Sequence, residues 1–561
     1  MTQAAQLFQN SAGKIYWWIF AFFVFYILAV LIHLNYYPLN GDEPRRAIIA
    51  IEMRHSGNFI MPTTMGWIYY NKPPIYNWLI SACMFVTGSE NEIPVRLPSL
   101  IAILLWSIIN YQVLKKILPR EVAALSSLFL MTSLDIFFWG LNNGGEIDIF
   151  YSFIVYLQVI SIFYFNLQKR WTALYLLSYL FCAIGLLTKG FPSILFQGLT
   201  LLALCVHNKS IRVLFRWQHL AGIALFFVIA GGYFYAYSFH SSSERFVLNL
   251  LKESLDKSAV GDYPERLIRK IIDYPFSLFK ILLPWSLLLL LVFKKHHFTF
   301  WSHPFIRFSL LFILFNIPVY WLTGHPRMRY SYMFVPFFMT IFAFIFYQFK
   351  AAYPAIVSKI FRWMSIVFVA ALTLILVLPL LNTVNYFWYV VAILSFGLYL
   401  YLYKKAAAYA VWYFGTGIIL LRFVFASLYL PARYESIKLN YDKEMASIAA
   451  KNDFKPICIY CKPDTLDLSI NLKIARFHYD SIPAIPFLAY EVPYYYYKSS
   501  RQIVTLDTSL RSNINYIGFR SLVKDMNPDI LYSFRNPEGE DVVLFRVKEP
   551  RQSFKSDLTL Y

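Results

Sequence analysis

Long apolar runs separated by short charged turns make up most of the chain. A membrane-spanning helix needs about 20 mainly apolar residues. About 13 runs approach or meet that length: 17–34, 97–114, 122–140, 148–166, 172–188, 191–206, 219–238, 276–293, 305–323, 331–349, 361–381, 386–403 and 407–428. A shorter run, 75–87, suits an interfacial or re-entrant helix. The pattern predicts a polytopic α-helical membrane protein.

Basic turns indicate which way the chain is threaded. If 75–87 does not cross the membrane, six basic turns fall on one side: those with Lys115, Lys169, Lys209, Lys294, Lys350 and Lys404. The positive-inside rule identifies that side as the cytoplasm. Four segments then meet on the outer face: 35–96, 141–147, 239–275 and 324–330. We expect the active site and the C-terminal region to lie there, facing the periplasm or the cell exterior.

The last 130 or so residues differ from the rest, being polar with short β-rich runs. Strands are expected near 503–506, 529–534 and 541–547, and helices near 443–450 and 521–526. This predicts two domains: a transmembrane domain, 1–430, with outer catalytic loops at 35–96 and 239–275, and a small α/β domain, 431–561.

Two features of the C-terminal region have alternative interpretations. Cys458 and Cys461 form a CxxC that could pair in an oxidising compartment, and without a second CxxC a zinc site is disfavoured. The aromatic run 494–497 is expected to pack against the membrane domain or the interface, with sugar stacking as the alternative.

Composition supports the membrane class. The chain has 561 residues, of which 58% are hydrophobic and only 15% charged, too few charges to cover a soluble protein of this size. The net charge of +20 is distributed between apolar runs, which disfavours nucleic acid as a partner. The first run, 17–34, lacks a small-residue cleavage site and is expected to span the membrane rather than act as a signal peptide.

Carboxylates stand at two span ends that share the outer face. Asp42 and Glu43 follow the first span, and Glu146 and Asp148 precede another. Two carboxylates from separate elements can deprotonate and orient a hydroxyl nucleophile. The alternative is that they cap the helices that follow them. Asp42, Asp148 and Glu43 are therefore candidate catalytic residues.

Cations on the same face suggest an anionic ligand. Lys72 precedes two prolines, Arg327, Arg329 and Tyr330 occupy a short turn, and Arg266 and Arg269 have helical spacing. Cations on an outer turn oppose the positive-inside trend. A phosphate leaving group would explain them, because developing negative charge needs fixed donors.

Several motifs together resemble the GT-C glycosyltransferases. They are Gly41-Asp42-Glu43-Pro44-Arg45, Tyr70-Asn71-Lys72-Pro73-Pro74, Arg96-Leu97-Pro98-Ser99, Leu187-Thr188-Lys189-Gly190, Leu283-Pro284-Trp285 and Arg329-Tyr330. The nearest families are the protein O-mannosyltransferases and the lipid A aminoarabinose transferases. The resemblance implies transfer of a sugar from a polyprenyl (undecaprenyl) phosphate carrier to a glycolipid such as lipid A, a polysaccharide or a protein, in the bacterial inner membrane.

The resemblance also implies roles for individual residues. Asp42 matches the essential first-loop aspartate and Asp148 the second acidic position. Lys72 matches a lysine near the lipid phosphate, and Arg329 and Tyr330 are phosphate ligands. Lys189 falls on a motif in which a structural role is the alternative. Arg45 and Tyr70, which lie within the motifs, are further candidates.

No cofactor is predicted. Close relatives often carry a glutamate before Lys-Pro-Pro that helps to form a metal site, whereas this chain has Asn71. The outer histidines, His55, His240 and His325, lack zinc-ligand spacing. A divalent metal is therefore not supported by the sequence.

Two other function classes remain. A transporter or flippase for a lipid-linked sugar would place charges within its spans. The predicted spans contain few, among them Asp135, Lys280, Arg307 and Arg422. A non-catalytic scaffold for polysaccharide assembly would not require Asp42. Replacing Asp42 therefore distinguishes a scaffold from an enzyme.

Overall fold

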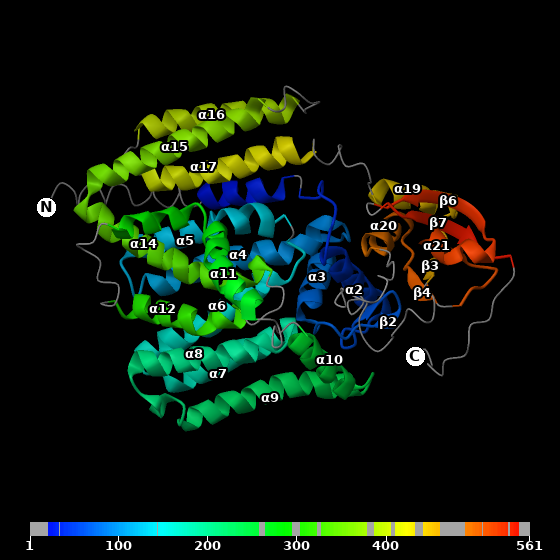
Figure 1. Cartoon of the computed structure of the whole chain (residues 1–561), viewed down its shortest axis with the longest axis horizontal. Coiled ribbons are helices and arrows are strands. Elements are labelled where there is room, and N and C mark those ends of the chain that lie inside the picture. Colours follow the sequence, from blue (N-terminus) through cyan, green and yellow to red (C-terminus); the bar gives the residue numbers. More distant parts are fainter. Residues whose placement is uncertain are drawn as a thin grey trace.

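The computed structural model describes residues 21–32, 34–142, 144–256, 264–293, 303–321, 327–377, 386–405, 410–431, 441–460, 489–507, 509–536 and 539–548. Its helices run side by side across the longest dimension of the molecule (Figure 1). The C-terminal sheet lies beyond one end of this bundle, next to α2 and α3. The first loop and the C-terminal region therefore meet at the same end, as the charge pattern predicted.

The bundle consists of apolar helices. They are Ala21–Leu31, α4 (Glu92–Leu114), α5 (Arg120–Met131), η1 (Asp135–Gly140), α6 (Asp148–Leu167), α7 (Trp171–Lys189), α8 (Pro192–Asn208), η2 (Ile211–Val213), α9 (Trp217–Ser238), α11 (Pro264–Ile281), η3 (Trp285–Phe293), α12 (Pro304–Asn316), α13 (Pro318–Trp321), η4 (Met328–Phe334), α14 (Val335–Ala352), α15 (Pro354–Val377), α16 (Tyr386–Lys405), α17 (Ala410–Val424) and η7 (Phe425–Tyr429). The chain is thus a polytopic helical membrane protein.

The helices of the structure that are long and apolar enough to span a membrane are fewer than the spans predicted from the sequence. Within the described residues, eight helices are long and apolar enough to cross a membrane, or nine if one bent pair is counted. The segments Ala21–Leu31, Pro192–Asn208 and Tyr386–Tyr401 are apolar but shorter. The total of about 13 spans stays a prediction.

The predicted span 276–293 is wrong as a single straight helix. The helices Ile271–Ile281 and Trp285–Leu291 meet at a bend of 110°. Pro284 lies at this break, and proline cannot donate the backbone hydrogen bond that would continue a helix. The bend places η3 against α14, inside the bundle rather than in line with α11.

A small layer covers one end of the bundle. It contains α2 (Glu43–Ser56), the hairpin of β1 (Thr63–Thr64) and β2 (Trp67–Ile68), α3 (Ile75–Thr87) and α10 (Ser243–Asp256). With 13 residues, α3 has the length expected of an interfacial helix, and it packs on α2 and α4. Glu52 of α2 holds the hairpin by accepting hydrogen bonds from Thr63 and the Met65 amide.

The C-terminal region contains a five-stranded mixed sheet in the order β4-β3-β5-β7-β6. Its elements are α19 (Tyr441–Lys451), β3 (Ile457–Tyr460), α20 (Glu491–Ser500), β4 (Thr505–Asp507), β5 (Asn515–Phe519), α21 (Arg520–Val523), η10 (Lys524–Met526), β6 (Asp529–Arg535) and β7 (Asp541–Arg546). Strands occur at the three predicted positions, whereas β3 and β5 were not anticipated. Both are short strands buried along their whole length, so they lack the alternation that identifies a half-exposed strand. Cys458 lies in β3, and Cys461 lies outside the described residues.

Tyrosines of α20 attach the C-terminal region to the first loop. Tyr494 to Tyr497 are all buried. The Tyr495 hydroxyl accepts a hydrogen bond from the Leu39 amide at 2.8 Å, and the Tyr497 hydroxyl donates to Glu90 at 2.6 Å. Lys498 pairs with Glu92 at 2.8 Å. The predicted packing of this aromatic run is confirmed.

Candidate active site

Four charged residues from three elements form one cluster at the end of the bundle. Asp148 is the first residue of α6, Lys189 the last of α7, and Arg329 lies in η4. The Arg329 Nε lies 2.8 Å from Asp148 Oδ2, and its Nη1 contacts Glu146. Lys189 contacts Asp148 from the other side. We call these four residues the bundle cluster; it contains two basic and two acidic side chains.

Aromatic rings surround Lys189 within the bundle cluster. The Lys189 Nζ lies 4.0 Å from the centre of the Tyr330 ring and 5.0 Å from that of Tyr151. These contacts fit a structural as well as a functional role, so the role of Lys189 stays a prediction. Arg327 precedes η4 and is exposed.

Asp42 stands at the start of α2 next to this cluster. Its carboxylate Oδ1 lies 2.6 Å from Arg45 Nη2. It makes no side-chain capping hydrogen bond to α2, so capping does not explain Asp42. Asp148 lies in the first turn of α6, where the helix dipole favours an acid, and it is also paired with Arg329 and Lys189. Gly41 lies beside the Glu146 carboxylate and has a φ of +62°, a left-handed conformation that favours glycine.

Exposure distinguishes Asp42 from the other acids. Its side chain is 31% exposed, whereas those of Glu146 and Asp148 are 9% and 5% exposed. A substrate can therefore reach Asp42 while the cluster beneath it stays largely enclosed. This difference favours Asp42 as the acid that meets the acceptor.

Glu43 was predicted to be catalytic, and its surroundings do not fit that role. Its side chain is completely buried, and both oxygens accept hydrogen bonds from Arg96 at 2.8–2.9 Å. The Gly145 amide donates to it as well, at 2.8 Å. Glu43 thus ties α2 to α4 and to the loop before α6, and a group with no exposed surface cannot contact a substrate.

Lys72 is buried and lies under α10. Its Nζ lies 2.7 Å from Glu253 Oε2, and both residues are 8% exposed. The Tyr70 hydroxyl is 3.2 Å from the Ser241 hydroxyl, and the Tyr70 carbonyl accepts a hydrogen bond from Asn249 at 3.1 Å. The predicted outer loops therefore meet here, with Glu253 of α10 as the ion-pair partner of Lys72.

The remaining candidates lie on α11, where helical spacing was predicted. Arg269 is exposed. Arg266 is within the helix, and its side chain lies outside the described part of the structure. Among the described side chains, that of Arg269 forms no hydrogen bond or ion pair with the bundle cluster.

Burial governs the protonation of the cluster. Loss of solvent raises the pKa of Glu146 to about 8, and the negative charges of Asp148, Asp42 and Glu43 add to the rise while Arg329 opposes it. Glu146 is therefore largely protonated at neutral pH. A protonated Glu146 leaves Arg329 less fully neutralised and better able to bind an added anion.

The donor set does not fit a divalent metal. In the described ranges, no group of three or more histidine, cysteine, aspartate or glutamate side chains has metal-binding geometry. Two acids of the site, Glu146 and Asp148, are both paired with Arg329. We therefore assign no step to a metal.

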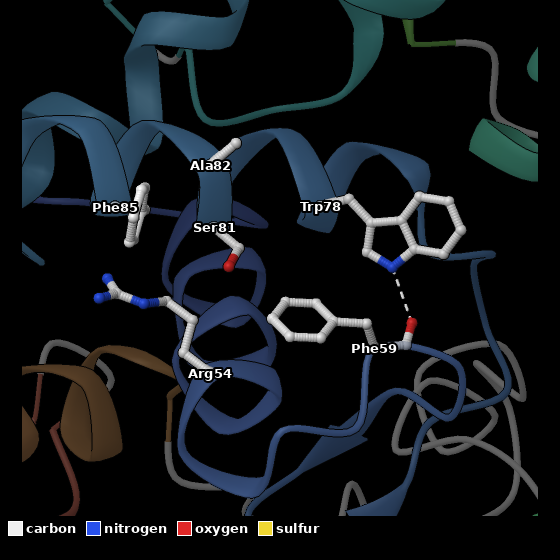
Figure 2. A pocket seen from close by; sticks show the side chains of 6 residues that line it. All are labelled: Arg54, Phe59, Trp78, Ser81, Ala82 and Phe85. Carbon is white, nitrogen blue, oxygen red and sulfur yellow. Dashed lines mark hydrogen bonds between the residues drawn. The ribbon is translucent and has the colours of Figure 1, made fainter.

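A shallow cavity of about 400 Å³ lies elsewhere, between α2 and α3. Figure 2 shows that Arg54 and the Ser81 hydroxyl lie beside the ring of Phe59, with Trp78 donating to the Phe59 carbonyl at 2.7 Å. The cavity contains none of the predicted site residues.

Comparison with known proteins supports the motif analysis. The family model described as "Dolichyl-phosphate-mannose-protein mannosyltransferase" matches residues 71–233. The resemblance to GT-C glycosyltransferases is confirmed. The matched range contains Lys72, Asp148 and Lys189, and the GT-C motif with Asp42 lies before it.

Curated relatives share part of the chain. An "Undecaprenyl phosphate-alpha-4-amino-4-deoxy-L-arabinose arabinosyl transferase" from Pseudomonas savastanoi pv. phaseolicola is 30% identical over 201 residues, which cover 35% of this chain and 37% of the relative. An uncharacterized protein of Aquifex aeolicus is 26% identical over 314 residues, or 53% of this chain and 60% of that protein. The alignments therefore span less than two thirds of these relatives.

A solved structure shows the GT-C fold over nearly the whole chain. ArnT from Cupriavidus metallidurans bound to undecaprenyl phosphate superposes with a TM-score of 0.68, covering 94% of this chain and 98% of ArnT. The sequence identity is 15%, so this likeness concerns the fold.

Two site residues were not predicted from the sequence. Glu253 pairs with Lys72, and Tyr490 lies against Arg45. An almost fully buried charged residue indicates that an oppositely charged partner lies next to it, because a buried charge without a partner is costly. That signal exists only when burial is known, since neither residue stands out along the chain.

Proposed function

We propose that this chain is a glycosyltransferase that moves a sugar from a polyprenyl phosphate carrier to an acceptor. The site would face the periplasm from the bacterial inner membrane. The observation that supports it most is the partly exposed Asp42 carboxylate beside a bundle cluster that contains two partly buried cations, Lys189 and Arg329. This arrangement supplies a base and an anion site at one place.

In the proposed reaction, Asp42 takes the proton of the acceptor hydroxyl or amine. The acceptor atom then forms a bond to the anomeric carbon while the bond from that carbon to the phosphate oxygen breaks. The phosphate leaves with the electron pair, and Lys72 and Arg329 stabilise its charge. A direct displacement of this kind inverts the anomeric configuration.

To bind Lys72 and Arg329, the donor phosphate must replace the carboxylates that now pair with these two cations. Lys72 is paired with Glu253, and Arg329 with Glu146 and Asp148. Buried cations without partners are costly. The carboxylates therefore hold the empty site together and give way to the donor phosphate, which brings equivalent negative charge.

The named relatives support the choice of donor. The Pseudomonas protein is named for an undecaprenyl phosphate-linked aminoarabinose, and the ArnT structure contains undecaprenyl phosphate. The acceptor in the proposal is a glycolipid such as lipid A, a polysaccharide or a protein.

The test is a reconstituted assay with a panel of polyprenyl phosphate sugars. Wild-type protein is expected to release free polyprenyl phosphate from one donor and to label an acceptor with its sugar. Mass spectrometry of both products measures the transfer. No release from any donor by folded protein would contradict the proposal and favour a flippase or a scaffold.

The pKa of Glu146 predicts an alkaline decline in activity. Above pH 8 the ionised Glu146 binds Arg329 more strongly and competes with the departing phosphate. We expect the transfer rate at saturating acceptor to fall about fivefold between pH 7 and pH 9. The rate profile is measured across that range with a fixed donor concentration.

Glu146→Gln provides the control for this decline. Glutamine keeps the shape of the protonated acid and does not ionise, so the alkaline limb is expected to disappear. A variant that declines as steeply as the wild type would show that another group is responsible.

A further inference from the structure

We infer that the C-terminal region completes the catalytic site. Tyr490, which directly precedes α20, acts as a positioning residue that holds Arg45 and, through Arg45, the Asp42 carboxylate. The inference deepens the proposed function and rests on it, because it assumes that Asp42 is the base.

Three contacts define this arrangement. The Arg45 guanidinium carbon lies 5.4 Å from the centre of the Tyr490 ring and 5.7 Å from that of Tyr69. Its Nη2 lies 2.6 Å from Asp42 Oδ1. The guanidinium therefore has aromatic rings from two parts of the chain around it and a carboxylate at its end, and Arg45 is only 3% exposed.

The position of Arg45 explains why it needs this support. Arg45 is in the first turn of α2, where the helix dipole is positive and disfavours a cation. Arg46, also buried, adds a second positive charge beside it. The Asp42 carboxylate offsets part of this cost, and the electron-rich faces of Tyr69 and Tyr490 offset more.

Tyr490 also engages Arg45 through its hydroxyl group. Burial raises the pKa of the Tyr490 phenol to about 12, while the charge of Arg45 and a hydrogen bond to it oppose the rise. Tyr490 thus stays neutral at physiological pH. It contacts Arg45 with both its ring and its oxygen.

The neighbouring helix holds Tyr490 in place. Tyr495 and Tyr497 of α20 anchor that helix to the first loop by the hydrogen bonds described above, and the Tyr494 hydroxyl donates to the Glu90 carbonyl at 3.2 Å. α20 also packs directly on α2, which carries Arg45. Docking of the C-terminal region therefore sets the position of Tyr490 relative to Asp42.

This arrangement predicts which kinetic constant depends on Tyr490. Without its ring, Arg45 can turn away and the Asp42 carboxylate loses its fixed direction. The proposed phosphate ligands, Lys72 and Arg329, lie on other elements, where Lys72 pairs with Glu253 and Arg329 with Glu146 and Asp148. A positioning role therefore lowers kcat and leaves the donor KM nearly unchanged.

The experiment compares Tyr490→Ala and Tyr490→Phe in the reconstituted transfer assay. Tyr490→Ala is expected to lower kcat about tenfold, with the donor KM within about twofold of wild type. Tyr490→Phe keeps the ring over the guanidinium and is expected to retain kcat within about threefold. Thermal unfolding of each purified variant accompanies the kinetics.

Two matched controls separate positioning from general loss of structure. Tyr532→Ala removes a ring that lies 4.5 Å from the Lys451 Nζ, within the C-terminal region and remote from Arg45. Tyr111→Ala removes a ring that lies 5.2 Å from the Lys115 Nζ, near the C-terminal end of α4 in the bundle. Both are expected to keep kcat within about twofold of wild type.

A double-mutant cycle tests whether Tyr490 acts through Arg45. If it does, adding Tyr490→Ala to Arg45→Lys lowers kcat by less than about twofold, because the geometry it supported is already lost. Additive losses, or a Tyr490→Ala effect no larger than that of Tyr532→Ala, would overturn the inference while leaving the proposed function intact. A wild-type protein without transfer activity would overturn both.

Discussion

Replacing Asp42 with asparagine is expected to lower sugar transfer about 10³-fold while the protein stays folded. The change removes the base and keeps the shape of the side chain. Asp42 is 31% exposed, whereas its partner Arg45 is only 4% exposed, so the change leaves a buried cation without this counter-charge, and thermal unfolding of the variant is measured beside its activity. Release of polyprenyl phosphate and labelling of the acceptor measure the effect.

Asp442→Asn is the matched control for this experiment. Asp442 is 32% exposed and pairs with Lys498 at 3.0 Å, much as Asp42 pairs with Arg45, but it lies on α19 of the C-terminal region. Its replacement is expected to leave transfer within about twofold of wild type. Equal activity in the two variants would eliminate Asp42 as the base.

Replacing Arg96 with methionine is expected to destabilise the protein by about 3–5 kcal/mol. Arg96 is 1% exposed, and besides Glu43 it donates hydrogen bonds to the carbonyl groups of Leu34, Tyr37 and Pro38. Its loss leaves the Glu43 carboxylate buried without its cation. Thermal unfolding in detergent, followed by intrinsic fluorescence, measures the change against wild type.

Two further variants test the reason for this loss. Adding Glu43→Gln to Arg96→Met removes the unpaired charge and is expected to restore part of the stability. Arg501→Met breaks an exposed pair with Glu90, at 3.1 Å, and is expected to cost less than about 1 kcal/mol. If Arg96→Met were as mild as Arg501→Met, the buried pair would not hold the first loop in place.

The residues proposed for chemistry were accessible from the sequence because their signals are local. Asp42 and Asp148 follow or precede apolar runs, and Lys72 stands before two prolines. The predicted threading brought their loops to one end of the bundle, and the contacts between Glu146 and Arg329 and between Lys72 and Glu253 agree with it. The sequence did not separate Asp42 from Glu43, since adjacent residues share every local property except the direction of the side chain.

By itself, the sequence determined that the protein is a polytopic helical membrane protein with charged outer loops, and its motifs indicated the GT-C class. These properties follow from apolar run length and charge placement, which neighbouring residues decide. The tertiary structure alone decided that Glu43 belongs to Arg96, that Lys72 faces Glu253 and that Tyr490 supports Arg45. These pairs join residues separated by 53, 181 and more than 400 positions. Tertiary packing and the cost of burying an unpaired charge determine these pairs. Neither can be read from a stretch of neighbouring residues.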